Sequence, residues 1–272
     1  DGSITQQAST TFVSSGNATL TASDGGSPPS TFYDITLNGV NNDFGGAVSV
    51  QGKDVTLRDK DALTLGTVTT TGDLDLQSAG ALDLGTSTVG GNLLANSGNA
   101  DITQAGALSV TGTTGLTAGT GDITLLNTSN GFGGLVTASG DDINLFGANG
   151  LEVAITATGN SALSSDDDLT VSGTTQNLTT TTTGTDSTTS FGATTVGGDL
   201  AVTSSGDVTQ TAALSVTGTS VLSATGKSVT LDDAANDFTG AVSGTAASMD
   251  LRDANALTLG TVTTTGDLDL QS

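Results

Sequence analysis

Ala62–Ser78 reads ALTLGTVTTTGDLDLQS, and Ala256–Ser272 repeats it letter for letter. Within this stretch, aliphatic residues alternate with Thr or Asp in the triplets Leu63–Leu65 and Leu74–Leu76, and a Gly-Asp pair precedes the second triplet. Alternation with a period of two is typical of a short strand, whereas Gly, Asn and Asp clusters are typical of turns. The stretch therefore predicts short strands joined by tight turns.

Similar triplets recur along the chain, beginning at residues 35, 55 and 74, at 123 and 143, and at 229, 249 and 268. Within each group the steps are 19 or 20 residues, and further apolar pairs lie between the triplets. Each step therefore holds about three short strands. We predict an all-β fold, a right-handed parallel β-helix (β-solenoid) with rungs of 19–21 residues. Helix is not expected, because no stretch has apolar residues at i, i+3, i+4 and i+7.

A longer repeat groups the rungs into superunits. DITQAGALSVTG from Asp101 resembles DVTQTAALSVTG from Asp207, and the ITQ at Ile4 resembles both. We expect a single continuous β-solenoid over residues 1–272, with superunits at about 1–100, 101–206 and 207–272. The third superunit is incomplete and no polar capping segment is recognisable, so we expect the natural chain to continue past both termini.

The alternation places Leu, Ile, Val and Ala inside the solenoid, and Thr, Ser, Asp and Asn outside. Phe44, Phe132 and Phe238 follow Asn-Asp or Asn-Gly at equivalent repeat positions. Their recurrence favours core residues at a corner over an exposed ligand platform. Arg58-Asp59 and Arg252-Asp253 are expected to be solvated surface charge pairs of little energetic weight.

Thr-rich stretches raise the question of ice binding, which uses paired T-x-T columns on a flat face. The central Thr of each triplet supplies a single outward column. Only Thr69–Thr71 and Thr179–Thr183 offer more hydroxyl groups, and they do not recur on every rung. The pattern therefore argues against ice binding.

Composition excludes most catalytic chemistry. The chain has 28 acidic and 5 basic residues, a net charge of −23, and no Cys, His or Trp. Such a chain repels nucleic acid and anionic membranes, and it cannot form disulfides, thiolate or imidazole metal sites, or Ser–His nucleophiles. No apolar run reaches the roughly 18 residues of a membrane helix. We therefore expect neither nucleic-acid binding nor membrane insertion by this segment.

Asp-rich turns are the candidate metal sites. Stacked carboxylates suit Ca²⁺, which takes six to eight oxygen ligands, but neither the GGxGxDxUx nonapeptide nor an EF-hand loop occurs. Asp after Gly also suits a tight turn and keeps an acidic protein soluble, which is the favoured interpretation. If calcium is bound, the candidate ligands are Asp166, Asp167 and Asp168. No other cofactor is expected.

Enzymatic activity is not expected. Some right-handed β-helices degrade polysaccharides, and a carboxylate pair can cleave a glycoside. Those enzymes use basic residues to hold acidic sugars and long loops to build a cleft. This chain has five basic residues, and its longest irregular stretch, Ser23–Thr31, contains one carboxylate.

The runs NDFTGAVS, LRDANALTLGTVTTTGDLDLQS and GDVTQTAALSVTG resemble the repeat regions of filamentous-haemagglutinin-like adhesins, very large bacterial exoproteins of two-partner secretion that include biofilm-matrix adhesins. The resemblance covers essentially the whole chain and is one of repeat style. It implies the stalk or fibre of a secreted or cell-surface adhesin, a rigid extracellular spacer that contacts adjoining repeats of a longer chain. The alternative is a module that binds exopolysaccharide or a cell-surface receptor through one face of the β-helix. The resemblance carries over no site residues.

Overall fold

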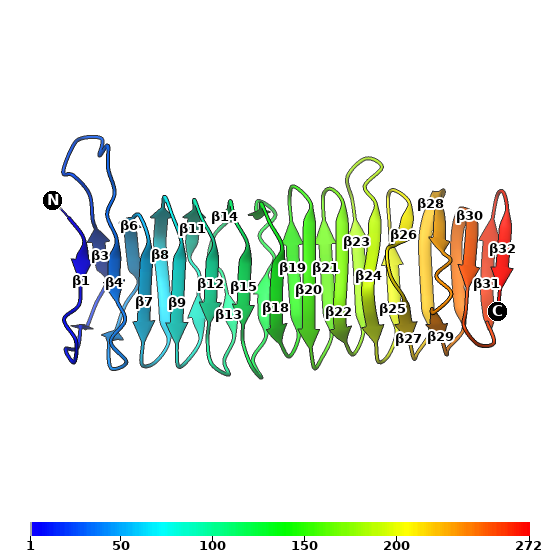
Figure 1. Cartoon of the computed structure of the whole chain (residues 1–272), viewed down its shortest axis with the longest axis horizontal. Helices are drawn as coiled ribbons and strands as arrows, with labels where there is room; N and C mark the ends of the chain where they lie inside the picture. Colours follow the sequence, from blue (N-terminus) through cyan, green and yellow to red (C-terminus); the bar gives the residue numbers. More distant parts are fainter. Residues whose placement is uncertain (1) are drawn as a thin grey trace. The chain divides into compact units, whose positions relative to one another are not determined.

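Residues 2–272 are described by a computed structural model, in which strands and turns alternate and no helix occurs. Figure 1 shows the strands of successive turns lying side by side. They stack in parallel in about 12 turns, which confirms the predicted β-solenoid. The chain divides into two compact units, an N-terminal unit up to Asp141 and a C-terminal unit from Asp142 to Ser272. Both proposed superunit boundaries, at residues 101 and 207, fall inside a unit.

The strands of the N-terminal unit are β1 (Ile4–Thr5), β2 (Val13–Ser14), β3 (Ala18–Thr21), β4 (Ile35–Leu37), β5 (Asp43–Phe44), β6 (Val48–Gly52), β7 (Val55–Asp59), β8 (Leu63–Thr70), β9 (Leu74–Ser78), β10 (Leu82–Asp83), β11 (Thr86–Val89), β12 (Leu93–Asn96), β13 (Ile102–Thr103), β14 (Leu108–Val110), β15 (Thr114–Thr117), β16 (Ile123–Leu125), β17 (Gly131–Phe132) and β18 (Val136–Gly140).

The strands of the C-terminal unit are β19 (Ile143–Gly147), β20 (Leu151–Ala157), β21 (Ser161–Ser165), β22 (Leu169–Thr175), β23 (Leu178–Thr182), β24 (Thr189–Val196), β25 (Leu200–Thr203), β26 (Val208–Gln210), β27 (Leu214–Val216), β28 (Ser220–Leu231), β29 (Asp237–Phe238), β30 (Val242–Arg252), β31 (Leu259–Thr264) and β32 (Leu268–Gln271).

Parallel register stacks similar residues from rung to rung. In the N-terminal unit one inward column runs through Ile4, Ile35, Val55, Leu74, Leu93, Thr114 and Val136. Its steps are 31, 20, 19, 19, 21 and 22 residues. The long first step includes a loop whose base is an antiparallel bridge between Ser23 and Phe32. Rung length is therefore less uniform than the predicted 19–21 residues, because additional residues leave the coil as loops while the column stays in register.

In the C-terminal unit, one column of register partners runs through Ile143, Ser161, Leu178, Leu200, Ser220, Val242 and Leu259. Ser161 and Ser220 are almost completely buried, as is Thr180 in the neighbouring column. The expectation that Leu, Ile, Val and Ala point inward therefore holds only in part, because hydroxyl side chains also lie inside, as Thr114 does in the N-terminal unit. The Thr179–Thr183 run does not lie on one face, because side chains alternate across a strand and Thr180 and Thr182 point inward.

No helix that could cross a membrane is found among residues 2–272.

Candidate functional site

A pair of amide side chains, a partly buried Gln and a buried Asn, forms the same corner three times. Gln104 and Asn130 exchange two hydrogen bonds, from Gln104 Nε2 to Asn130 Oδ1 (2.8 Å) and from Asn130 Nδ2 to Gln104 Oε1 (2.7 Å). The Asn130 amide also accepts the Leu108 N–H and donates to the Leu125 carbonyl. The pairs Gln6–Asn42 and Gln210–Asn236 repeat this arrangement, and all three Asn side chains are fully buried.

Each corner Asn is followed two residues later by a Phe that packs into the core. Phe44, Phe132 and Phe238 are 4%, 7% and 1% exposed, which confirms that they are core residues. The ITQ and Asn-x-Phe recurrences are thus two halves of one structural element. Their separation, 36 residues in the first copy and 26 in the other two, conceals the pairing in the sequence.

The expectation of solvated Arg-Asp charge pairs is wrong for the aspartates. Asp59 is 2% exposed, and its two carboxylate oxygens accept the N–H groups of Phe44 (3.1 Å) and Asp61 (3.0 Å). Asp253 is 3% exposed and accepts the N–H groups of Phe238 and Asn255. Each carboxylate accepts hydrogen bonds from backbone N–H groups and so stabilises the corner. Neither carboxylate forms an ion pair with the Arg that precedes it.

Above Asp59, the surface of the N-terminal unit is hollowed into a polar groove. Arg58 in β7, Gln77 in β9 and Asn96 in β12 hold the same register position in three successive rungs, so their side chains emerge along one line. The groove has a volume of about 350 Å³. Its lining comprises Val40, Arg58, Asp59, Lys60, Gln77, Ser78, Ala79, Asn96 and Gly98.

A second pocket of about 460 Å³ adjoins the groove, because Val40 lines both. Its other walls are residues 6–11 and 38–41, which are mostly amides and hydroxyls. The first loop is two residues longer than in the other copies of the corner: Phe12 follows Gln6 by six positions, whereas Leu108 follows Gln104 and Leu214 follows Gln210 by four. This longer loop, residues 6–11, forms one wall of the pocket. No sequence pattern indicates the groove or the pocket.

The basic side chains differ in their partners. Lys53, Lys60 and Lys227 are ion-paired with aspartates, and the hydrogen bonds that they donate to Asp54, Asp61 and Asp186, respectively, raise the pKa of these amines. Within residues 2–272, Arg58 and Arg252 are the only basic side chains without an ion pair. The groove therefore contains a half-buried guanidinium with all of its donors available.

Asp and Asn side chains at the turns join neighbouring rungs. Asp54 Oδ1 accepts the N–H of Asp73 (3.0 Å), and Asp73 Oδ1 accepts the N–H of Asn92 (2.7 Å). In the C-terminal unit, Asn177 Oδ1 accepts the N–H of Asp199, whose own carboxylate accepts the N–H of Thr219. The sequence predicts a turn role for the Gly-Asp residues Asp73 and Asp199, but it indicates neither the bond to the following rung nor the same role for Asp54 and Asn177.

The three candidate calcium ligands have different partners. Asp166 accepts the Thr183 hydroxyl, Asp167 accepts the N–H of Asp168, and Asp168 accepts the N–H (2.8 Å) and hydroxyl (2.9 Å) of Thr188. In the part of the chain that is described, no group of three acidic side chains is placed to hold a metal ion. Calcium binding by Asp166, Asp167 and Asp168 stays a prediction.

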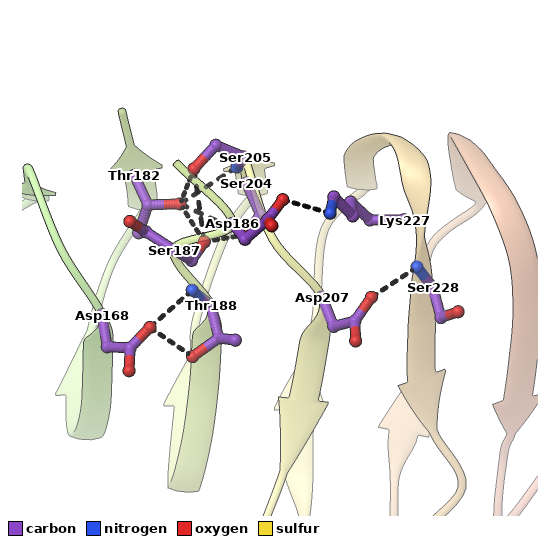
Figure 2. A network of polar contacts seen from close by, with 10 residues as sticks. All are labelled: Asp168, Thr182, Asp186, Ser187, Thr188, Ser204, Ser205, Asp207, Lys227 and Ser228. Atoms are coloured by element: carbon purple, nitrogen blue, oxygen red, sulfur yellow. Dashed lines mark hydrogen bonds and ion pairs between the residues drawn. The ribbon is translucent and has the colours of Figure 1, made fainter. Parts of the chain in front are cut away.

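Nearby, hydroxyl groups replace aliphatic residues in the core of the C-terminal unit. Figure 2 shows Thr182, Ser187, Ser204 and Ser205 gathered into a network. Thr182 Oγ1 donates to the Ser187 carbonyl (2.8 Å) and accepts the Ser205 N–H (3.1 Å). On the surface beside them, Lys227 pairs with Asp186, and Asp207 accepts the Ser228 N–H. The hydrogen bonds at the corners, at the turns and in the core join parts of the chain to one another and so stabilise the fold. The groove at Arg58 has unused donors and is therefore the candidate binding site.

The chain is thus a repeat protein of the β-solenoid class. Residues 1–51, 52–83, 72–139 and 175–245 match the family described as Repeats of unknown function (DUF5649), and since these segments cover most of the sequence, the chain belongs to that family. No curated protein and no solved structure matches it.

Proposed function

We propose that the chain is a stalk or fibre segment of a large secreted bacterial adhesin or biofilm-matrix protein, in which it acts as a rigid extracellular spacer. The observation that supports this proposal is the duplication of Ala62–Ser78 at residues 256–272, in strands β8 and β9 and again in β31 and β32. Duplication of whole rungs preserves a scaffold and its length, whereas an active site gains nothing from being copied with its framework.

The contacts between rungs explain how such a spacer would resist bending. Aliphatic columns, parallel strand pairing and the Asp-to-backbone bonds all join one rung to the next, so stability accumulates between neighbours. Each rung adds about 4.8 Å of length. Outward carboxylates repel other copies and so oppose lateral strand pairing. The absence of Cys suits export as an unfolded chain.

The proposal includes no catalytic step. The groove offers a single carboxylate, Asp59, and both of its oxygens accept backbone hydrogen bonds. A general acid or base needs a proton-transferring group within reach of substrate, and this carboxylate lies buried beneath the groove.

Deletion of residues 101–206 tests the spacer role. The deletion joins Ala100 to Asp207, so that DVTQ takes the place of DITQ and the repeat stays in phase. We expect an unchanged β-type circular dichroism spectrum and a maximum dimension in small-angle scattering that is shorter by about 25 Å, or about five rungs. An unfolded product, or one of unchanged length, would contradict the proposal.

The second candidate function is a binding module, and the polar groove at Arg58 is the observation that favours it. Replacing the chain within the whole protein by an unrelated β-solenoid of equal length distinguishes the two. Retained adhesion supports the spacer, whereas lost adhesion supports a binding role.

A further inference from the structure

Three hydrogen-bond donors line the groove at regular intervals. Arg58, Gln77 and Asn96 are register partners in β7, β9 and β12, so their backbones lie about 4.8 Å apart from one rung to the next. This advance is close to the length of one pyranose unit in an extended polysaccharide. A linear sugar chain that follows the column can therefore present one residue to each rung.

These donors are not used within the described residues. Arg58 and Gln77 have no side-chain hydrogen bond or ion pair there, and Asn96 uses only its Oδ1, which accepts the Gly98 N–H (2.8 Å). A guanidinium presents five N–H groups in a planar fork that matches a carboxylate, and each amide adds an NH₂. Acceptor-rich ligands are thus favoured.

The charge of the groove differs from that of the chain. Its lining has two basic side chains and one acidic one, in a protein with 28 acidic and 5 basic residues. The acidic one is Asp59, whose oxygens are directed to backbone N–H groups. Lys60 is engaged by Asp43 and Asp61, so Arg58 is the available cation. An anionic group of a ligand would be held there.

The shape of the groove suits a sugar ring. Val40 is 57% exposed and stands between the groove and the adjoining pocket, where it offers an apolar surface among donors. Gly98, at φ +69, leaves open space, since a Cβ there would meet only the Ser78 carbonyl at 3.7 Å. The apolar face of a pyranose can rest on such a side chain while its hydroxyls bond to the amides.

We propose that this groove binds a uronic-acid oligosaccharide. The carboxylate of one sugar forms a two-pronged pair with Arg58, Gln77 and Asn96 bond to the hydroxyls of its neighbours, and Val40 supports a ring. A longer chain extends over Val40 into the pocket walled by residues 6–11. The site is compatible with the spacer role and does not depend on it.

The chain contains its own control. Arg252 and Gln271 are register partners in the second copy of the same sequence. There, Ala254 stands at the position of Lys60, Ala234 at that of Val40, and Asp232 at that of Asn38. Arg252, like Arg58, has no ion pair within residues 2–272, but Lys60 and Val40, which line the groove around Arg58, are replaced in the second copy.

The test is calorimetric titration of the 272-residue chain with tetragalacturonate in about 0.15 M salt, where charge repulsion is screened beyond about 8 Å. We expect saturable binding that Arg58→Ala weakens at least about tenfold, equivalent to ~1.4 kcal/mol. Arg252→Ala is expected to bind like the wild type. Circular dichroism of each variant verifies its fold, and Gln77→Ala, which alters an exposed side chain, is expected to weaken binding as well.

Several results would overturn the proposal. These are an absence of saturable binding by the wild type, an Arg58→Ala variant that binds normally, and an equal loss in Arg252→Ala. Equal affinity for cellotetraose would show that the carboxylate is not recognised. Equal affinity for a short polyglutamate would show that the groove recognises carboxylates without recognising the sugar rings.

Discussion

The side chains of Gln210 and Asn236 exchange two hydrogen bonds of 2.8 Å each across 26 residues of sequence. Asn236 also accepts the Leu214 N–H (2.8 Å) and donates to the Leu231 carbonyl (3.0 Å). One fully buried amide therefore satisfies backbone groups from two parts of the chain. Because a buried polar group without a partner is costly, the pair fixes how the chain turns at this corner.

Replacing this Asn tests its contribution to stability. Asn236→Ala would remove both bonds to Gln210, whose Nε2 keeps only its bond to the Ala212 carbonyl, and would remove the Asn236 partner of the Leu214 N–H and of the Leu231 carbonyl. We expect the free energy of unfolding, measured by urea denaturation, to fall by about 3 kcal/mol or more, at 1–3 kcal/mol for each orphaned group. The exposed Asn255 provides the control, since Asn255→Ala should change stability by no more than about 0.5 kcal/mol. Similar losses in both variants would contradict this role.

Two neighbouring buried threonines should respond in opposite directions. Thr180 is fully buried and its hydroxyl has no hydrogen-bond partner, so Thr180→Val removes an unsatisfied polar group. We expect stability to rise by about 1 kcal/mol. Thr182→Val instead deletes bonds to Ser187 and Ser205 and should lower stability by about 1–3 kcal/mol. Thermal denaturation of both variants gives the comparison, and a loss of stability in Thr180→Val would refute the first expectation.

The carboxylate of Asp199 should stabilise the fold most at neutral pH. Hydrogen bonds from the Thr219 N–H and hydroxyl lower its pKa. A folded-state pKa below the unfolded value gives stability that is present above about pH 3.9 and lost as the pH falls through the folded pKa. Asn can accept the same N–H, as Asn177 does one rung earlier. The melting temperature of Asp199→Asn should therefore fall less than that of the wild type between about pH 5 and pH 3.

Identical acid profiles for the two proteins would show that this carboxylate contributes nothing through its ionisation.

Asp75 should have the opposite dependence on pH. Desolvation raises its pKa, and its Oδ1 is buried without a hydrogen-bond partner, so ionisation opposes folding. The cost is absent below the unfolded pKa of about 3.9 and grows as the pH rises through the folded value. We expect Asp75→Asn to raise stability at pH 7 by up to about 1 kcal/mol, with the gain vanishing near pH 3.

The control for Asp75 is Glu152→Gln, which neutralises an exposed outward carboxylate of β20. It should leave stability at pH 7 nearly unchanged. An Asp75→Asn variant that is less stable at pH 7 than at pH 3, relative to wild type, would contradict the prediction.

The strands and the solenoid fold could be predicted because their signals are local. Alternation in triplets such as Leu74–Leu76 indicates a strand, and Gly-Asp pairs indicate turns, without knowledge of the partner rung. The burial of Phe44 followed from its recurrence at Phe132 and Phe238. These inferences needed only short stretches of sequence or comparison of one repeat with another.

What escaped prediction depends on register or on distant pairing. Thr180 lies inside because a shift of one residue exchanges the two faces of a strand, and a run of identical Thr residues gives no indication of phase. Asp59 follows a charged Arg, yet its partner Phe44 lies 15 residues away. The groove requires Arg58, Gln77 and Asn96 to share one register position across three rungs, and no local signal at any one of them indicates that they meet.

The two identical seventeen-residue stretches begin 194 residues apart, since 256 − 62 = 194, and both form neighbouring strands of the coil. If two gene copies recombine with one stretch misaligned on the other, the product gains or loses a block of that size. The recombined chain has the same seventeen residues at the crossover as each parent stretch. The aliphatic columns therefore stay in register there, and the junction has a sequence that the protein already contains. A lineage can thus alter the reach of such a molecule in a single genetic event, with no mutations needed to repair the join.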